Sequence, residues 1–213
     1  MINIFYTNIN KCFATKHWEN YLEALPVFFQ EYILKYQHQN DRLRVLCGKL
    51  LLHKLLLEIN QENIFDKVQL DKFKRPYLSN NIDFNISHSG SFVVCCLTIS
   101  DTNNKVGIDI EKKREINYEE FERVFTELEI KIIKSSPNPI DTFFKFWTMK
   151  EAVMKADGRG FHLSPKTFTV INNIAEVENK KWFLTNILIA PDYDCHLATE
   201  ISEIKMNVTE ARF

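Results

Sequence analysis

Two carboxylates lie within the segment KVGIDIEKK (105–113), which otherwise has the pattern of a short buried strand. Successive strand residues point to opposite faces, so Asp109 and Glu111 should share the face opposite to the apolar residues at 106, 108 and 110, with Cα atoms roughly 6.5 to 7 Å apart. Like charges this close repel each other unless a cation lies between them, and Mg²⁺ takes carboxylate and phosphate oxygens together. The pattern fits a metal site, and it also fits a strand with one apolar and one solvated face. Gly107 adds a hint, because a glycine in a strand often marks close approach by another group.

A third acid and a lysine lie four residues apart near the end of a predicted helix, FKFWTMKEAVMKADGRG (144–160), which two glycines would terminate. Glu151 and Lys155 therefore lie on one flank of the helix. They form either a surface ion pair worth about 0.2–0.5 kcal/mol or a third metal oxygen and a phosphate ligand. Lys150 falls within the apolar stripe of the same helix, where a lysine must extend to solvent or meet an anion.

The segment FNISHSG (84–90) puts Ser87 and His88 at the end of a predicted strand. A hydrolase nucleophile and base are not indicated, because adjacent strand residues face opposite ways and the sequence has no G-x-S-x-G motif. One interpretation is a turn in which the serine bonds its own backbone. The other is that His88 donates to a phosphate or to the edge of a purine.

Basic side chains gather in two further places. The segment KFKRPYL (72–78) contains Arg75 directly before a proline, and DRLR (41–44) contains Arg44 at the start of a predicted helix. Such residues are ordinarily solvated, and they form a binding site only where they converge on one anion. Arg75 and Arg44 are therefore candidate phosphate ligands whose roles depend on the fold.

Helical and strand periodicities alternate along the chain. The predicted elements are, in order, helices at 17–36 and 40–59, strands between 68 and 100, a turn at 101–104, a strand at 105–111, helices at about 117–135 and 140–156, and a β-rich end. Each half joins helices to a small antiparallel sheet, which predicts an α+β fold of two structurally similar lobes of about 100 residues each. The expected division is an N-terminal lobe at 1–102 and a C-terminal lobe at 103–213.

Composition excludes several classes of protein. The chain has 213 residues, and its 27 Lys and Arg nearly cancel its 28 Asp and Glu, so no overall field favours nucleic acid or an anionic membrane. Five cysteines without a C-x-x-C pair indicate neither a disulfide framework nor a zinc site. The sequence has no signal-peptide pattern and no apolar run of the ~20 residues that span a bilayer, so we expect a soluble cytoplasmic protein.

In their order and spacing these segments resemble the Sfp-type (surfactin-synthetase-activating) 4′-phosphopantetheinyl transferases. The diagnostic pair is VGIDIE at 106–111 and FWTMKEAVMK at 146–155, which matches the family pattern G-[IV]-D followed about forty residues later by [FW]-[SCT]-x-K-E-[AS]-x-x-K. RPYL, FNISHSG and DRLRVLCGKLL are similar to the family's first-half motifs. The resemblance covers about residues 30–170.

The resemblance implies an enzyme of two pseudo-symmetric lobes that binds coenzyme A in the cleft between them. Such an enzyme transfers the phosphopantetheine arm to a serine of an apo carrier protein and releases adenosine 3′,5′-bisphosphate. By motif, Asp109, Glu111 and Glu151 would hold Mg²⁺ on the pyrophosphate. Lys155 would bind or protonate a phosphate, and Glu111 or a water near it would deprotonate the carrier serine.

The adenosine and 3′-phosphate end of coenzyme A would be held by residues from both halves. The candidates implied by the resemblance are Arg44, Arg75, Ser87 and His88, with Lys150 as a further phosphate contact. Where the family commonly has Gly-Lys-Pro, this chain has Lys74-Arg75-Pro76. Arginine binds phosphate as a planar fork and lysine as a point charge, so the geometry of that contact would differ.

Two other functions suit the same residues: a non-catalytic module that binds coenzyme A or a carrier protein, and a metal-dependent nucleotide pyrophosphohydrolase. The segment at 112–125, with Phe121 and Phe125 on a predicted helix, is a candidate docking surface for the carrier or an ordinary amphipathic helix. Since two lobes in one chain complete the cleft, a monomer is expected. The resemblance leaves the carrier open among those of fatty acid, polyketide, nonribosomal peptide and lysine pathways.

Overall fold

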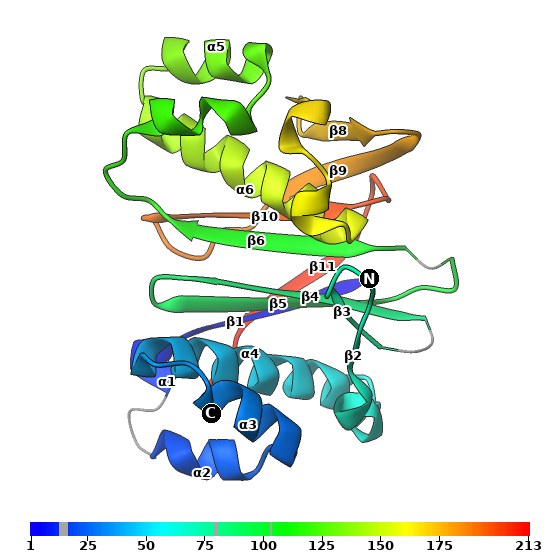
Figure 1. Ribbon diagram of the computed structural model, residues 1–213. Coiled ribbons are helices and arrows are strands. Elements are labelled where there is room, and N and C mark those ends of the chain that lie inside the picture. Colours follow the sequence, from blue (N-terminus) through cyan, green and yellow to red (C-terminus); the bar gives the residue numbers. More distant parts are fainter. Residues whose placement is uncertain (13–16, 79–80, 103) are drawn as a thin grey trace.

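The computed structural model describes residues 1–12, 17–78, 81–102 and 104–213, and it stacks four layers in the order helices, sheet, sheet, helices (Figure 1). The first sheet has the order β11-β1-β5-β4, and its strands are β1 (Ile2–Asn8), β4 (Ile82–Ser89), β5 (Phe92–Ile99) and β11 (Met206–Glu210). The second sheet has the order β6-β10-β9-β8-β7, and its strands are β6 (Val106–Lys112), β7 (Val170–Ile171), β8 (Ile174–Val177), β9 (Lys180–Asn186) and β10 (Tyr193–Thr199). A two-stranded ribbon joins β2 (Gln69–Leu70) to β3 (Pro76–Tyr77). The predicted α+β class is confirmed.

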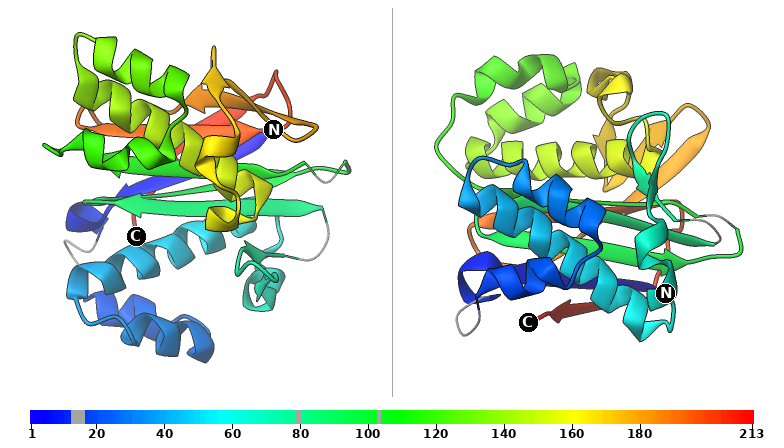
Figure 2. Two further views of the ribbon diagram at one scale, coloured as in Figure 1. Left: turned by 45° about the horizontal axis from the view of Figure 1, so that its top comes forward. Right: turned by 60° about the horizontal axis from the view of Figure 1, so that its bottom comes forward.

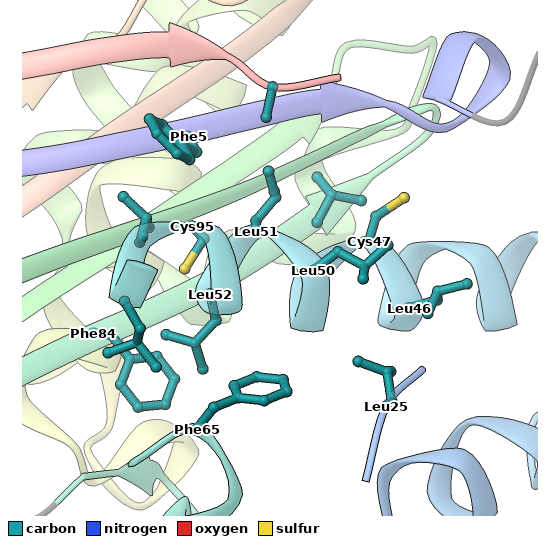
Figure 3. Close-up of a cluster of buried hydrophobic side chains, with 14 of the residues drawn as sticks. Phe5, Leu25, Leu46, Cys47, Leu50, Leu51, Leu52, Phe65, Phe84 and Cys95 are labelled. Carbon is teal, nitrogen blue, oxygen red and sulfur yellow. The ribbon is translucent and has the colours of Figure 1, made fainter. Parts of the chain in front are cut away.

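Helices cover the outer face of the first sheet (Figures 1 and 2). They are α1 (Ile9–Cys12), α2 (Trp18–Glu23), α3 (Val27–Leu34), α4 (Gln39–Glu58) and a 3₁₀ helix at Glu62–Lys67. The predicted helix at 17–36 is divided at Pro26, whose ring suits only the start of a helix and which precedes α3. Helix α4 packs between the sheet and the outer helices, as Figure 3 shows for Leu25, Phe65 and Phe5 around it.

The buried arc of α4 is wider than a single stripe. Leu51 and Leu52 are both fully buried, whereas Leu57, which the periodicity places on the core stripe, is 46% exposed. The periodicity assumes one packing partner, but α4 has apolar neighbours both on the sheet side and on the side of the outer helices.

Helix α6 (Pro139–Asp157) lies on the outer face of the second sheet, with α5 (Glu127–Ser135) beside it (Figure 1). Around these helices lie 3₁₀ helices at Tyr118–Val124, Gly160–His162 and Pro165–Thr167. The predicted helix at 117–135 is divided at Thr126, whose side chain accepts from the backbone of Glu129 while the Glu129 side chain accepts from the backbone of Thr126. Helix α6 ends at Gly158, which has φ of +93°.

The two sheets share a core of their own. Ile108 and Ile110 of β6 pack with Ile4 of β1 and Val94 of β5, and all four are fully buried. The apolar face of β6 therefore holds the lobes together, as alternation predicts, and its acidic face points toward α6. Among the described residues, no helix is long and apolar enough to cross a membrane.

Strand β11 crosses from the C-terminal part of the chain to the first sheet. It pairs in parallel with β1, from Ile2 opposite Met206 to Tyr6 opposite Glu210. The division into lobes at residue 102 stays a prediction. Strand β11, which it assigns to the C-terminal lobe, completes the sheet of the N-terminal lobe.

Candidate active site

Strands β4 and β6 form a seam between the two sheets (Figure 1). Alternate polar side chains of β4 accept hydrogen bonds from alternate backbone N–H groups of β6. The pairs are Asp83 with Val106 (2.8 Å), Asn85 with Ile108 (3.0 Å), Ser87 with Ile110 (3.4 Å) and Ser89 with Lys112 (3.1 Å). Each pair is 23 residues apart, so the strands run parallel. Side chains of the first lobe thereby satisfy the backbone of the strand that carries the acids.

Gly107 lets α6 approach the acidic face of β6. A Cβ atom at this position would lie 2.2 Å from the carbonyl oxygen of Ala152 and 2.4 Å from the amide nitrogen of Ala156, both in the backbone of α6. Only glycine leaves room for this contact. The close approach brings Glu151 and Lys155 over Asp109, and it confirms the expectation that the glycine marks a close neighbour.

One cavity of about 270 Å³ collects the predicted chemistry at the seam. Its lining consists of Ile86, Ser87, His88, Asp109, Glu111, Trp147, Glu151 and Lys155. These residues come from β4, β6 and α6, so both lobes contribute to one site. The three predicted acids, Lys155, Ser87 and His88 are all brought together here.

Asp109, Ser87 and Lys155 form a closed triangle of hydrogen bonds. The Lys155 Nζ donates to Asp109 Oδ1 at 2.6 Å and to Ser87 Oγ at 2.9 Å, and Ser87 Oγ donates to the same Asp109 oxygen at 2.9 Å. Ser89, one strand repeat further on, donates to Glu111 Oε2 at 2.7 Å. Each β6 acid is therefore held by one serine of β4.

Burial and the neighbouring charges shift the pKa values of the acids and of the lysine in this cavity. Burial and the neighbouring Asp109 raise the pKa of Glu151 to about 7. Burial also raises the pKa of Glu111, although the hydrogen bond from Ser89 opposes the shift. Burial lowers the pKa of Lys155, but the Asp109 carboxylate more than offsets this and the net direction is upward.

The donor atoms fit a divalent cation. Asp109 Oδ2 is buried without a hydrogen-bond partner, while Oδ1 is fully engaged. Three carboxylates face one ammonium group in the cavity lining, and oxygen donors of this kind suit Mg²⁺. As the described side chains stand, however, no three Asp, Glu, His or Cys residues are close enough together to hold an ion.

His88 and Arg44 lie toward one end of the site. The ring of His88 is exposed, yet partial desolvation and the positive charges of Lys155 and Arg44 lower its pKa. Arg44 donates from Nε to the Gly90 carbonyl at 2.8 Å and from Nη1 to Asp41 at 2.5 Å. It lines a separate hollow at the start of α4, not the cavity that holds the acids.

Arg75 is not at the cavity. Its guanidinium is buried and forms a two-bond pair with Asp83, at 2.8 and 2.7 Å. Nε donates to the Lys155 carbonyl and Nη2 to the Val106 carbonyl, both at 3.0 Å. The resemblance implies a phosphate ligand at this position, but four of the five guanidinium N–H donors of Arg75 are already bonded within the protein.

Lys150 is also directed away from the cavity. Its side chain is 1% exposed, and Nζ pairs with Glu129 Oε2 at 2.9 Å. Nζ also donates to the carbonyls of Pro165 and Phe168, at 2.7 and 2.8 Å. The apolar stripe predicts that a lysine here either extends to solvent or meets an anion, and Lys150 meets the chain's own Glu129.

Two further residues of the site were not singled out as functional from the sequence. Ser89 shares a strand face with Ser87, and this alternation within FNISHSG is the signal that could have identified it. Trp147 of α6 forms a wall of the cavity. Phe121 is half-buried and contacts Phe143 and Trp147 edge-on, and Phe125 is 2% exposed. The predicted helix here is a 3₁₀ helix at Tyr118–Val124, and a docking role of 112–125 stays a prediction.

This fold and this cavity define a class of protein: two helix-covered sheets that meet at a seam, with a cluster of acids and one lysine in the cavity there. The sequence comparisons agree. Residues 105–205 match the model of the 4′-phosphopantetheinyl transferase superfamily, and residues 14–99 match the model of the N-terminal part of 4′-phosphopantetheinyl transferase. The chain belongs to the 4′-phosphopantetheinyl transferase superfamily.

Named relatives share about a third of the aligned residues. The transferase gsp of Aneurinibacillus migulanus is 33% identical over 71% of this chain and 65% of its own length. The transferase Sfp of Bacillus subtilis is 29% identical over 71% of this chain and 68% of its length, and a relative from Haemophilus influenzae is 33% identical over 74% and 68%. The chain thus matches about two thirds of the length of these curated relatives. Holo-[acyl-carrier-protein] synthase of Thermotoga maritima aligns over 45% of this chain and 61% of its own, at 17% identity and a TM-score of 0.35.

Proposed function

We propose that this protein transfers the 4′-phosphopantetheine moiety of coenzyme A to a serine of an apo carrier protein and releases adenosine 3′,5′-bisphosphate. The observation that carries the proposal is the triangle of Lys155, Asp109 and Ser87 in one cavity with Glu111 and Glu151. The family membership and the names of the relatives support it. The two lobes that line the cavity belong to one chain, so we propose that the monomer is active.

Lys155 is the proposed phosphate ligand. An ammonium group has three N–H donors, of which Asp109 and Ser87 take two. The remaining donor is available to a phosphate oxygen, and the ion pair with Asp109 keeps the group charged. Charge neutralisation at fixed positions is the main requirement of phosphoryl transfer, so a preformed cation of this kind suits the reaction.

The proposed metal ligands are Asp109, Glu111 and Glu151. Asp109 Oδ2 has no partner, and the pKa of Glu151 is raised. Both observations support the binding of a cation between these carboxylates. When bound, Mg²⁺ would neutralise the pyrophosphate and stabilise the departing bisphosphate.

Glu111 is the proposed base for the carrier serine, either directly or through a neighbouring water. Burial raises the pKa of Glu111 and so increases its affinity for a proton. Ser89 fixes Oε2 and so sets the direction of the carboxylate. The attacking hydroxyl belongs to the carrier, so the cavity need not supply a nucleophile, and its own serine hydroxyl at Ser87 is bonded to Asp109 and Lys155.

The proposed contacts to the adenosine and 3′-phosphate end are Ser87, His88 and Arg44. Near neutral pH the lowered pKa keeps the ring of His88 neutral, so it can donate to a phosphate or a purine edge and can gain a proton when an anion binds. Arg75 and Lys150 are not included, because their head groups are satisfied within the protein.

The test is a mass assay on apo carrier proteins. The protein is mixed with coenzyme A, Mg²⁺ and one carrier at a time, from fatty acid, polyketide, nonribosomal peptide and lysine pathways. We expect at least one carrier to gain the mass of phosphopantetheine, and we expect a chelator to prevent the gain. No gain on any carrier, with folded protein, would refute the transferase, and consumption of coenzyme A without a carrier would favour a pyrophosphohydrolase. Binding of coenzyme A or of a carrier without turnover would favour a non-catalytic module.

A further inference from the structure

Arg75 contacts three elements at once from the segment before β3. Through Asp83 it reaches β4, through the Val106 carbonyl it reaches the start of β6, and through the Lys155 carbonyl it reaches the last turn of α6. Asp83 is 3% exposed and also accepts the backbone N–H of Val106 at 2.8 Å. The pair therefore lies where the first lobe, β6 and α6 converge.

The bond from Arg75 to α6 satisfies a carbonyl group at the C-terminal end of this helix. The last four carbonyl groups of a helix have no partner within it, and a positive charge near that end is favourable. Arg75 supplies a hydrogen-bond donor and a positive charge to the carbonyl of Lys155. Lys155 is also the residue whose ammonium group binds Asp109. A Cβ atom at Gly158 would lie 3.2 Å from Arg75 Cδ, so the glycine that ends α6 also leaves space for the arginine side chain.

We infer that Arg75 and Asp83 form a clamp that positions Lys155, and that Arg75 is not a coenzyme A ligand. The clamp fixes the end of α6 against the seam, so that the ammonium of Lys155 stays on Asp109 and Ser87. The inference rests on the proposed function, since Lys155 is the proposed phosphate ligand.

Binding of a coenzyme A phosphate by Arg75 is energetically unfavourable. To bind a phosphate, Arg75 would have to give up its two bonds to the buried Asp83 carboxylate and its bonds to two carbonyl groups. A buried charge that loses its partner is strongly destabilising, and the side chain would also have to reach a cavity that it does not line.

The first experiment compares kinetic constants of Arg75→Gln and Asp83→Asn with two co-substrates, coenzyme A and dephospho-coenzyme A, which lacks the 3′-phosphate. A displaced Lys155 costs turnover, so we expect kcat to fall on the order of 10- to 100-fold. We expect KM for coenzyme A and the preference for coenzyme A over dephospho-coenzyme A to stay close to wild type. A raised KM with unchanged kcat, together with loss of that preference in Arg75→Gln alone, would overturn the clamp and make Arg75 a phosphate ligand.

Lys105→Gln is the matched control. Lys105 Nζ also contacts Asp83 Oδ1, at 3.4 Å, but its side chain is 34% exposed and, in contrast to Arg75, bonds to neither the Val106 carbonyl nor the Lys155 carbonyl. The Lys105→Gln substitution removes a positive charge near the Asp83 carboxylate and leaves the contact between Arg75 and α6 intact. We expect near wild-type kcat, and a loss as large as that of Arg75→Gln would contradict the inference.

A double variant keeps the test decisive if the single variants fold poorly. Replacing both members of a buried ion pair by apolar residues is often neutral for stability. We expect Arg75→Met with Asp83→Leu to recover part of the Tm lost by each single variant, because the Val106 N–H still lacks its acceptor. We expect kcat to stay low, because the Lys155 carbonyl has lost its donor. Wild-type kcat in this folded variant would overturn the inference.

Hydrogen exchange separates a failure of the clamp from a failure of the proposed function. If the wild type transfers nothing, the function fails, but the clamp still predicts faster amide exchange in the last turn of α6 in Arg75→Gln than in Lys105→Gln. Unchanged exchange there would refute the clamp without bearing on the transferase.

Discussion

Asp109 has different surroundings at its two oxygens. Oδ1 accepts from Lys155 and from Ser87, whereas Oδ2 is buried and has no partner. One carboxylate can thus hold the lysine and still present an oxygen to a second cation. This division of roles explains why the residue pairs with an ammonium and yet belongs to a proposed metal site.

Asp109→Asn should abolish transfer and keep the fold. The amide retains the size of the side chain but removes the charge that holds Lys155 and the proposed cation, so we expect activity to fall on the order of 100-fold or more. Carrier mass shift measures the activity, and circular dichroism measures the fold. Asp192→Asn, an exposed acid of the same lobe with a 3.9 Å contact to Lys112, is the control. Activity near wild type in Asp109→Asn would exclude Asp109 as a ligand.

His196 should make the protein sensitive to acid. It lies opposite Asp109 across β6 and β10, its Nδ1 is 2.7 Å from Thr148 Oγ1, and burial followed by the charge of Lys145 lowers its pKa from 6.5 to about 4. The folded state therefore binds fewer protons than the unfolded state between these values. Stability should be fully present above pH 6.5 and fall toward pH 4, by on the order of 3 kcal/mol at about 1.36 kcal/mol per pH unit.

Chemical unfolding at pH 7, 5.5 and 4 measures this loss. His196→Gln should lose less stability over that range than the wild type, whereas His17→Gln, which removes an exposed histidine, should behave as the wild type. An unchanged pH dependence in His196→Gln would contradict the assignment.

Local patterns predicted the acids better than the basic residues. Strand alternation places Asp109 and Glu111 on one face, and a spacing of four places Glu151 beside Lys155, so short-range geometry was sufficient. Lys150 and Arg75 depend on partners in other elements, Glu129 and Asp83, and no local pattern indicates which anion a buried cation will meet. Their assignment from a motif alone therefore missed the pairing.

At the scale of elements, the seam is built by the polar face of β4. The alternating polar residues of IDFNISHS suggest a solvated strand face, but Asp83, Asn85 and Ser87 are 3%, 8% and 5% exposed. They are buried because β6 lies against them and needs acceptors for its edge N–H groups. Sequence alone cannot separate a face that meets water from one that meets the unpaired backbone of another strand.

Gly107→Ala should separate β6 from α6. The new methyl would meet rigid backbone at 2.2 and 2.4 Å, so we expect a loss of about 1–3 kcal/mol or more and a loss of activity larger than the loss of folded protein. Urea unfolding and the carrier assay measure the two effects. Gly48→Ala is the control, because its nearest contact is a side-chain methyl of Ile86, at 3.1 Å, and not backbone. Full activity in Gly107→Ala would show that the spacing of the two elements does not matter.

The pair of Lys150 and Glu129 should act on stability and not on the chemistry. It joins α6 to α5 and to the segment after α6, and both side chains are almost fully buried. Lys150→Met leaves Glu129 without its cation, so we expect a loss of about 3–5 kcal/mol. Lys150→Met with Glu129→Leu should recover only part of it in thermal unfolding, because Glu129 also accepts from the backbone amides of Thr126 and Val170. A raised KM for coenzyme A in this double variant would instead support the phosphate contact that the motif suggests.

For the whole molecule, the helix-and-sheet pattern of each half was visible in the sequence, and so was the turn between them. The place of β11 was not. It pairs with β1 at the other end of the chain, and a parallel partner that distant leaves no turn or spacing to indicate it. The N-terminal lobe is therefore completed by the last strand of the chain.

Deletion of residues 206–213 should weaken the N-terminal lobe first. The deletion removes the strand that pairs with β1 and the hydrogen bond from the Ala211 amide to the Tyr6 carbonyl at 2.8 Å, and it leaves β1 as an exposed edge. With roughly 0.5–1.5 kcal/mol for each net hydrogen bond, the loss should reach several kcal/mol. Hydrogen exchange should show lost protection in β1 and β5 before β9 and β10. Val208→Thr, which changes a 40% exposed side chain and keeps the strand, should retain wild-type protection. Equal loss of protection in both sheets would mean that the seam of β4 and β6 makes the two lobes unfold as one unit.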